Sequence, residues 1–376
     1  MHPSSLLSYY PTYAILDEVL SIGDYKKLNL FFDLKNNLQT TYMEHAIVNI
    51  VANSKKSKYI DSSIFSSLIS FLSFHKIYSV KRGIDIDFFV FFESGISYYH
   101  QNISKQYKIS RKIDDLYGLD KEDRDLFYKV LNGNFQLIEK ACNKMPNIKV
   151  VRVPNLEADF VPYYLLTRGL VERGNGIGNI IYSNDHDLWQ CADNDIVIFS
   201  KSGKRKKLIK RGTIMSELLK KEVDFPDQYL PLAMSIIGDS GDDVTGVKNV
   251  GPARFLTMFD ELVSLVGPMR DVYDKVEKGE EIFSSNTGNI QNKFLKEVVE
   301  SELKHKTISK NLKLVSFELI SRALDNPMKT EMIDKRNVIT SIIKDDSVAP
   351  RDSMRKALEM SGVFLEQSSI DFIYYI

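Results

Sequence analysis

Short apolar runs rich in β-branched and aromatic residues recur along the first half of the chain, with helical periodicity between them. The runs lie at 28–34, 87–92, 149–153, 179–182 and 195–199. Runs of this kind are typical of buried strands, and their alternation with helices predicts a mainly parallel sheet with crossover helices. The serine-rich apolar stretch at 62–74 is shorter than the ~20 residues that cross a bilayer, so we expect a core helix there and no membrane span.

The strand pattern ends near Glu222, and helical periodicity continues through 227–237 and beyond Pro252. Amphipathic patterns at 291–304 and 351–360 are typical of helices on a modest core. A chain of 376 residues is long enough for two or three units. We expect an N-terminal extension at 1–25, an α/β domain at 26–222 and a helical subdomain at 223–376.

Composition adds constraints on partners and compartment. Lysine plus arginine and aspartate plus glutamate number 50 each, so a nucleic-acid binder of this composition needs separate acidic and basic regions. Cys142 and Cys191 give no disulfide framework, and no charged-then-apolar leader begins the chain, which favours a cytoplasmic protein, in the host cell if viral. The six histidines lack zinc-type spacing.

Acidic residues follow four of the predicted strands, close to the point where each strand ends. They are Asp33, Glu93, Glu157, Asp159, Asp185 and Asp187. Ligands of parallel sheets bind outside the carboxyl ends of the strands, so we expect these carboxylates to share one rim. Any single aspartate there is most simply a turn or N-cap residue. Repetition at four strand ends instead favours bound divalent metal, because clustered carboxylates repel one another.

The most distinctive motif is GDSGDD followed by GVKNVG, at 238–251. Asp239 and Asp242 are three residues apart, so they can share a face and hold a hard divalent cation. Gly246 and Gly251 let a phosphate approach backbone N–H groups. Metal and phosphate together indicate phosphodiester chemistry.

Three motifs in order resemble the structure-specific 5′ nuclease family of phage 5′ exonucleases, flap endonucleases and phage ribonuclease H. They are EAD at 157–159, SNDHDLWQ at 183–190 and the 238–251 segment, and the resemblance covers roughly 28–255. Each motif alone is weak, but their order is specific. The resemblance implies a PIN-like, Rossmann-type α/β fold and a helix-hairpin-helix DNA-binding motif at about 236–260.

The resemblance also implies two Mg²⁺ ions, with Mn²⁺ as a substitute and K⁺ as a further candidate at the hairpin. By position it assigns one ion to Asp33, Glu93, Glu157, Asp159 and Asp185, and the other to Asp187, Asp239 and Asp242. One ion would lower the pKa of an attacking water and the other would stabilise the leaving 3′ oxygen. We expect His186 to be a spacer pointing away from the metals and Trp189 to lie in the core.

Basic segments supply the expected DNA contacts. Residues 105–112 resemble the family's YKxxR segment, which implies a basic helix whose Lys108 and Arg111 act as catalytic cations on the transition state. The alternative is a solvated basic helix face. The residues expected to contact DNA are Tyr107, Gly246, Lys248, Gly251, Arg254, Lys204 and Lys206. The two last-named lysines belong to the basic stretch at 201–211, for which the alternative interpretation is a solvated hairpin.

The implied function is a Mg²⁺-dependent, structure-specific 5′–3′ nuclease of DNA replication or repair, with exonuclease, flap endonuclease or ribonuclease H activity. Its substrate would be DNA with a 5′ flap, nick or RNA primer. A sliding clamp, for which the tail at 367–375 has weak resemblance to a binding motif, and a single-strand binding protein are further candidate partners. The alternatives are a catalytically inactive DNA-binding replication scaffold, against which the retained acids argue, and a PIN-type ribonuclease, against which the 238–251 motif argues.

Overall fold

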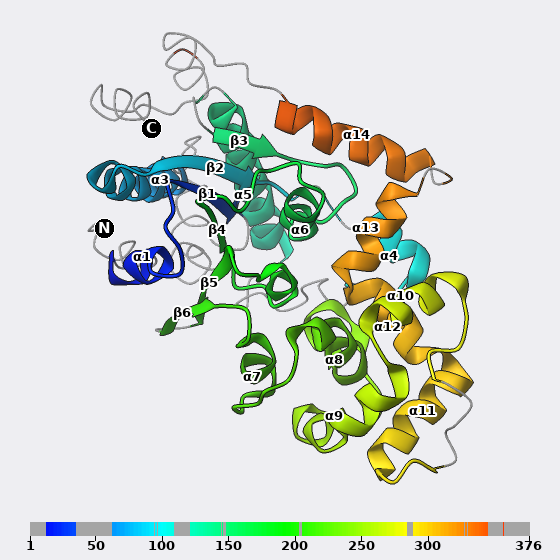
Figure 1. Cartoon of the computed structure of the whole chain (residues 1–376). Helices are drawn as coiled ribbons and strands as arrows, with labels where there is room; N and C mark the ends of the chain where they lie inside the picture. Colours follow the sequence, from blue (N-terminus) through cyan, green and yellow to red (C-terminus); the bar gives the residue numbers. More distant parts are fainter. Residues whose placement is uncertain are drawn as a thin grey trace.

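The computed structural model describes residues 13–34, 62–93, 95, 97–108, 121–143, 145, 148–202, 205–283, 289–326, 328, 330–344 and 356. A six-stranded sheet of order β3-β2-β1-β4-β5-β6 forms the centre of the first half (Figure 1). Its strands are β1 (Lys27–Asp33), β2 (Asp85–Phe91), β3 (Ile148–Val151), β4 (Ile177–Tyr182), β5 (Ile196–Ser202) and β6 (Arg205–Ile209). The pairs are parallel except β5–β6, which is an antiparallel hairpin. The five predicted strands and the mainly parallel sheet are confirmed.

Alternate residues of the central strands face two separate hydrophobic layers, as a side-chain period of two requires. Leu30 and Phe32 of β1 pack in the cluster that contains residues of α1 (Tyr13–Leu20), α3 (Ser62–Arg82) and α5 (Lys121–Cys142). Phe31 packs in the other cluster, with α6 (Phe160–Thr167) and the helices of the second half. Both faces of β1 are therefore buried, which explains its continuous apolar sequence. Figure 1 shows α1 and α3 on one side of the sheet and α6 on the other.

The predicted core helix at 62–74 is confirmed as part of α3, where Leu68, Phe71 and Leu72 are buried. The expected N-terminal extension contains α1, whose Leu16 and Val19 join the same cluster. At least this part of it therefore belongs to the packed core. None of the helices in the described part of the chain combines the length and the apolar character that a membrane span needs.

Helices dominate the second half, as predicted. They are α7 (Ile214–Leu219), α8 (Leu230–Ile237), α9 (Pro252–Val266), α10 (Met269–Lys278), α11 (Lys293–His305), α12 (Thr307–Val315), α13 (Phe317–Asp325) and α14 (Thr330–Lys344). A small antiparallel sheet of β7 (Gly238–Asp239) and β8 (Val244–Thr245) lies between α8 and α9. Helix α11 confirms the amphipathic pattern at 291–304, whereas the pattern at 351–360 lies outside the described residues apart from 356.

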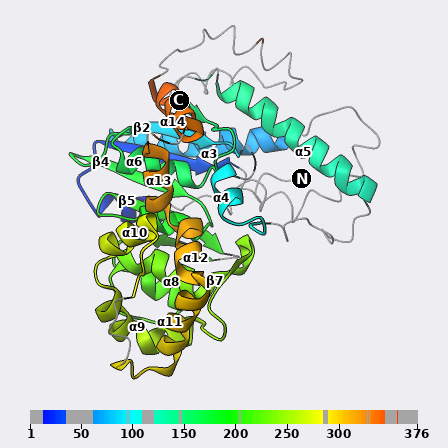
Figure 2. The ribbon, with the colours of Figure 1, turned by 90° about the vertical axis from the view of Figure 1, so that its right-hand side faces the viewer.

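One hydrophobic cluster joins the two halves. It contains Phe31 of β1, Phe160 of α6, Leu232 of α8, Leu312 of α12 and Ile339 of α14. Helix α12 packs on α8 and on α4 (Tyr98–Ile103), and α13 packs on α6 (Figure 2). The predicted boundary near 222 stays a prediction, and the core continues across it.

Candidate metal centre

Three aspartates from two segments meet at the carboxyl edge of the sheet. Asp159 is the N-cap of α6, where its carboxylate accepts a hydrogen bond from Phe160 N at 2.8 Å. Asp185 follows β4, and Asp187 opens the 3₁₀ helix η2 (Asp187–Cys191) and donates its N–H to Asp185 Oδ1 at 3.0 Å. One carboxylate oxygen of each aspartate lies within 4.8 Å of the other two. We call these three residues the aspartate trio.

The trio is electrostatically unfavourable as it stands. Burial, followed by the charge of Glu157, raises the pKa of Asp159 well above its usual range. Burial and then the charge of Asp185 have the same effect on the pKa of Asp187. Burial is also the main cause that raises the pKa of Asp185. Carboxyl groups in such surroundings resist ionisation unless a cation compensates them.

Two buried carboxylate oxygens without hydrogen-bond partners, one in the trio and one on Glu157, test whether the residues fit a metal. Asp187 Oδ1 and Glu157 Oε1 are buried and make no hydrogen bond to the described part of the chain. An unsatisfied buried carboxylate oxygen is costly. Hard divalent cations such as Mg²⁺ prefer oxygen ligands of this type. The donor set and its unsatisfied oxygens therefore fit a divalent cation.

An acidic pair, Glu157 and Asp242, lies next to the trio and is held by Lys108. Its ammonium lies 2.8 Å from Glu157 Oε2 and 3.1 Å from Asp242 Oδ2. The Tyr107 hydroxyl lies 3.0 and 2.9 Å from the same two oxygens, and all four side chains are buried. Burial acts to raise the pKa of Glu157, but the charge of Lys108 and its hydrogen bond outweigh it, so the pKa is lowered. Asp242 in turn contributes to the raised pKa of Asp185 and Asp187, which places the pair beside the trio.

The basic helix expected at 105–112 is not present in its described part. Helix α4 ends at Ile103, and residues 105–108 form a turn in which Lys108 has a left-handed backbone with φ 56°. Lys108 N donates to Asp242 O at 3.2 Å. This bond to a distant segment replaces the bond to the fourth preceding carbonyl that a helix requires. Arg111 lies outside the described residues.

Asp33 and Glu93 lie at the same sheet edge but outside the trio. Asp33 ends β1 and is paired in register with Phe91, and Glu93 follows β2 by two residues. Neither belongs to the described group whose oxygens lie within 4.8 Å of one another. In this structure Asp187 groups with Asp159 and Asp185, whereas Glu157 groups with Asp242 through Lys108. The division of the ligands between two ions stays a prediction.

The 238–251 segment is shaped by close backbone contacts. Gly238 has φ 86°, and a Cβ there would lie 2.7 Å from Val244 O and closer still to Gly246 N. A Cβ on Gly246 would overlap Ile237 O. These glycines therefore allow the β7 and β8 backbones to meet, which the sequence interpretation of Gly246 as a phosphate contact did not include. Asp239 accepts a hydrogen bond from Gly241 N at 2.8 Å and helps to raise the pKa of Asp185.

The expected DNA contacts occupy several exposed positions. Lys248 and Arg254 are exposed, and Gly251 is the N-cap of α9. Arg254 donates to Asn249 O and lies over the Phe294 ring at 4.7 Å. Helices α8 and α9 flank this segment in the order that a helix-hairpin-helix needs, but the motif itself stays a prediction.

The basic stretch at 201–211 is largely a hairpin of β5 and β6, as the alternative interpretation predicted. Several of its charges are already paired within the protein: Lys207 with Glu217, Lys210 with Glu18, and Arg211 with Asp193. Lys206 lies on β6, where burial lowers its pKa, and Lys204 lies outside the described residues.

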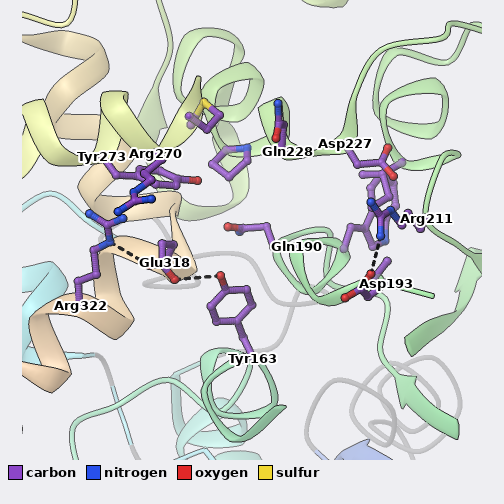
Figure 3. A pocket seen from close by; sticks show the side chains of 15 residues that line it. Tyr163, Gln190, Asp193, Arg211, Asp227, Gln228, Arg270, Tyr273, Glu318 and Arg322 are labelled. Atoms are coloured by element: carbon purple, nitrogen blue, oxygen red, sulfur yellow. Dashed lines mark hydrogen bonds and ion pairs between the residues drawn. The ribbon is translucent and has the colours of Figure 1, made fainter. Parts of the chain in front are cut away.

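A cleft lies on the other side of η2 and was not predicted. It has a volume of about 520 Å³ and lies between α6, α10 and α13 (Figure 3). Gln190 of η2 lines it together with Tyr163, Tyr273 and Glu318. Trp189 is buried and His186 is exposed, as expected from the sequence. Gln190 carries no sequence signal beyond its position three residues after Asp187.

The chain has the fold of the structure-specific 5′ nucleases, with a PIN-type sheet. No family model matches it, and no curated protein is similar to it in sequence. It is similar to the bacteriophage T5 D15 protein co-crystallised with metal ions, at 17% identity and a TM-score of 0.57, over 85% of this chain and 98% of that one.

Two further solved structures agree on the fold. T5 D15 flap endonuclease in a pseudo-enzyme–product complex with DNA and metal ions has 18% identity and a TM-score of 0.56, over 85% of this chain and 100% of that one. T5 5′-exonuclease with bound zinc has 17% identity and a TM-score of 0.55, over 89% of this chain and 99% of that one. At these identities the likeness establishes the fold.

Proposed function

We propose that this protein is a divalent-metal-dependent, structure-specific 5′ nuclease that acts near 5′ flaps, nicks or RNA primers in DNA replication or repair. The observation that carries the proposal is the aspartate trio, in which Asp159 and Asp187 are buried and Asp185 is half-buried, at the carboxyl edge of a sheet with a 5′ nuclease fold. Structures with the same fold contain metal ions and, in one complex, DNA. Buried carboxylates that lack a compensating partner are also typical of functional sites.

The aspartate trio would hold the first ion, and Glu157, Asp239 and Asp242 would share the second. Asp33 and Glu93 lie at the same edge and are further proposed ligands. Mg²⁺, or Mn²⁺ in its place, would supply acidification of a water and charge stabilisation of the leaving 3′ oxygen. The side chains supply the rest. Lys108 keeps the pKa of Glu157 low, which favours an ionised Glu157, and its ammonium holds Glu157 beside Asp242.

The 238–251 segment would place the duplex. Gly251 precedes the first turn of α9, in which Pro252 has no N–H and Arg254 N donates to Gly251 O, so the Ala253 N–H is the first-turn donor that suits a backbone phosphate. Lys248 and Arg254 are exposed on either side of this turn and would add sequence-independent charge. K⁺ bound near the hairpin, Tyr107 beneath it, and Lys204 and Lys206 on the β5–β6 side are further proposed contributors.

Cleavage of a 5′-labelled flap substrate tests the proposal. We expect product release with Mg²⁺ or Mn²⁺, none with chelator, and a loss of at least about 100-fold in rate for Asp185→Ala. Asp260→Ala is the matched control, because Asp260 is exposed on α9, away from the sheet edge. Its rate should equal that of the unchanged protein.

The same assay separates the alternatives. Binding of flap DNA without cleavage under any metal condition would identify an inactive scaffold. Cleavage of single-stranded RNA without action on flaps would identify a PIN-type ribonuclease. Flap cleavage that survives Asp185→Ala would contradict the assignment of the trio as metal ligands.

A further inference from the structure

The junction between α12 and α13, residues 314–317, is held by side chains from the first half of the chain. The last carbonyls of a helix and the first N–H groups of the next have no partner within their own helices. Here His100 Nε2 donates to Leu314 O at 2.9 Å. Gln190 Nε2 donates to Val315 O at 2.8 Å, and Gln190 Oε1 accepts from Phe317 N at 3.0 Å.

Gln190 also reaches the metal centre. Its Nε2 donates a second hydrogen bond to Asp187 O at 3.1 Å, so one amide joins the backbone of a trio member to both α12 and α13. These contacts use both N–H groups and the carbonyl oxygen of the side chain. Figure 3 shows this side chain in the cleft between η2 and the C-terminal helices. A glutamate offers no donor at this position, and a methionine offers neither donor nor acceptor.

A second connection runs through His100. Its ring stacks on Tyr107 with 4.5 Å between centroids and 12° between planes. Tyr107 contacts Glu157 and Asp242, the acidic pair beside the trio. Burial lowers the pKa of His100, so the ring is neutral and its Nε2–H is fixed by Leu314 O. The junction therefore contacts the metal centre from two directions.

The other ligand-bearing segments also rest on α12 and α13. Phe317 packs edge-on against Phe160, the residue after Asp159, with centroids 5.8 Å apart. Asn311 Nδ2 donates to Ser235 O and Thr245 O, each at 2.8 Å, on both sides of the 238–243 acids. Each acidic segment of the trio and of the acidic pair therefore has a direct or one-step contact with this helix pair.

We propose that the α12–α13 pair is the positioning element of the metal centre, and that Gln190 is a positioning residue that fixes Asp187. The proposal rests on the metal site proposed above. Buried carboxylates of like charge move apart unless their backbones are held. Gln190 holds the backbone carbonyl of Asp187, whose carboxylate Oδ1 makes no hydrogen bond to the described residues. Outer-shell contacts of this kind typically change metal affinity or activity by about 10- to 100-fold.

Gln190→Met tests the proposal, because methionine keeps the length and removes all three hydrogen bonds. Gln228→Met is the control, since Gln228 is an exposed glutamine lining the same cleft. Calorimetric titration with Mn²⁺ should give a dissociation constant about 10- to 100-fold weaker for Gln190→Met and unchanged for Gln228→Met. In flap cleavage, kcat should fall and recover as Mn²⁺ is raised, while KM for DNA stays within about twofold, because the DNA contacts are untouched.

Equal Mn²⁺ affinity in the two variants would overturn the proposal. If Gln190→Met does not fold, Gln190→Glu repeats the test, because it keeps the acceptor for Phe317 N and loses both donors. Mn²⁺ binding by the unchanged protein without any DNA cleavage would refute the proposed nuclease function, and the positioning role would still be decided by the affinities. Absence of Mn²⁺ binding by the unchanged protein would refute both.

Discussion

Lys108 shows how a single side chain determines the protonation of its surroundings. Removing a cation from water is costly, and the cost is offset only by close, well-oriented partners. Lys108 has two carboxylate oxygens within 3.1 Å. With this cation in place Glu157 ionises readily, whereas the pKa of Asp159 and of Asp187 is raised. Burial acts to raise the pKa of all three carboxyl groups, and the contact with Lys108 reverses the outcome for Glu157.

His75 of α3 is a buried histidine outside the proposed metal ligands, and its surroundings fix it as neutral. Its Nδ1–H donates to Phe71 O at 2.8 Å, and its Nε2 accepts from the Tyr182 hydroxyl at 2.5 Å. Burial lowers its pKa from 6.5 to about 4. As pH falls below 6.5 the unfolded chain takes up a proton that the folded chain refuses. The free energy of unfolding should therefore fall between pH 6.5 and 4, by about 3 kcal/mol for this group.

Urea unfolding of metal-free protein at several pH values measures this effect. His75→Gln keeps polar atoms but cannot titrate, so its free energy of unfolding should depend less on pH than that of the unchanged protein. Equal pH dependence in His75→Gln and the unchanged protein would show that His75 is protonated in the folded state.

At the scale of elements, the β7–β8 contact determines where the 239–242 acids lie. Gly246→Ala places a methyl group on Ile237 O, and backbone atoms cannot move aside as a flexible side chain can. We expect a loss of about 1–3 kcal/mol in stability and weaker Mn²⁺ binding, because Asp239 and Asp242 move with the strands. Thermal unfolding and calorimetry measure the two effects.

Gly279→Ala is the control for this substitution. Gly279 has φ 72°, but a Cβ there meets nothing within 4 Å. Its cost should be about 1 kcal/mol from backbone strain alone, with Mn²⁺ binding unchanged. Identical Mn²⁺ affinity in Gly246→Ala would mean that the acids do not depend on this strand contact.

Elements with a strong local signal could be predicted from the sequence, and long-range contacts could not. The apolar runs of β1 and β2 predict strands because both of their faces are buried. The acids after those strands and after β4 lie at one edge because the three strands are parallel. The turn at 105–108 was missed because its cause is a bond from Lys108 to Asp242 O. Gln190 was missed because its partners Val315 and Phe317 lie more than a hundred residues away.

At the scale of the whole molecule, the C-terminal helices belong to the same core as the sheet. Leu312, Val315, Phe317, Ile320 and Leu324 are all buried in the cluster that contains Phe31 and Phe160. Each contributes roughly 1.5–3 kcal/mol when fully buried, and a whole domain is stable by only about 5–15 kcal/mol. Loss of these helices should therefore exceed the stability of what remains.

A chain ending at residue 306 tests this reasoning. We expect no cooperative thermal transition by circular dichroism and no flap cleavage, even at high Mn²⁺. A cooperative transition with retained cleavage would show instead that the first 306 residues form an independent nuclease.

The arrangement around the α12–α13 junction also has a consequence for biosynthesis. Translation proceeds from the N-terminus, and the acids at 157–242 leave the ribosome long before Val315 and Phe317, which secure Gln190. If those late contacts align Asp187, a partly translated chain has its ligands but lacks their final geometry. A nascent polypeptide would then not cleave the nucleic acids around it until its last helices emerge.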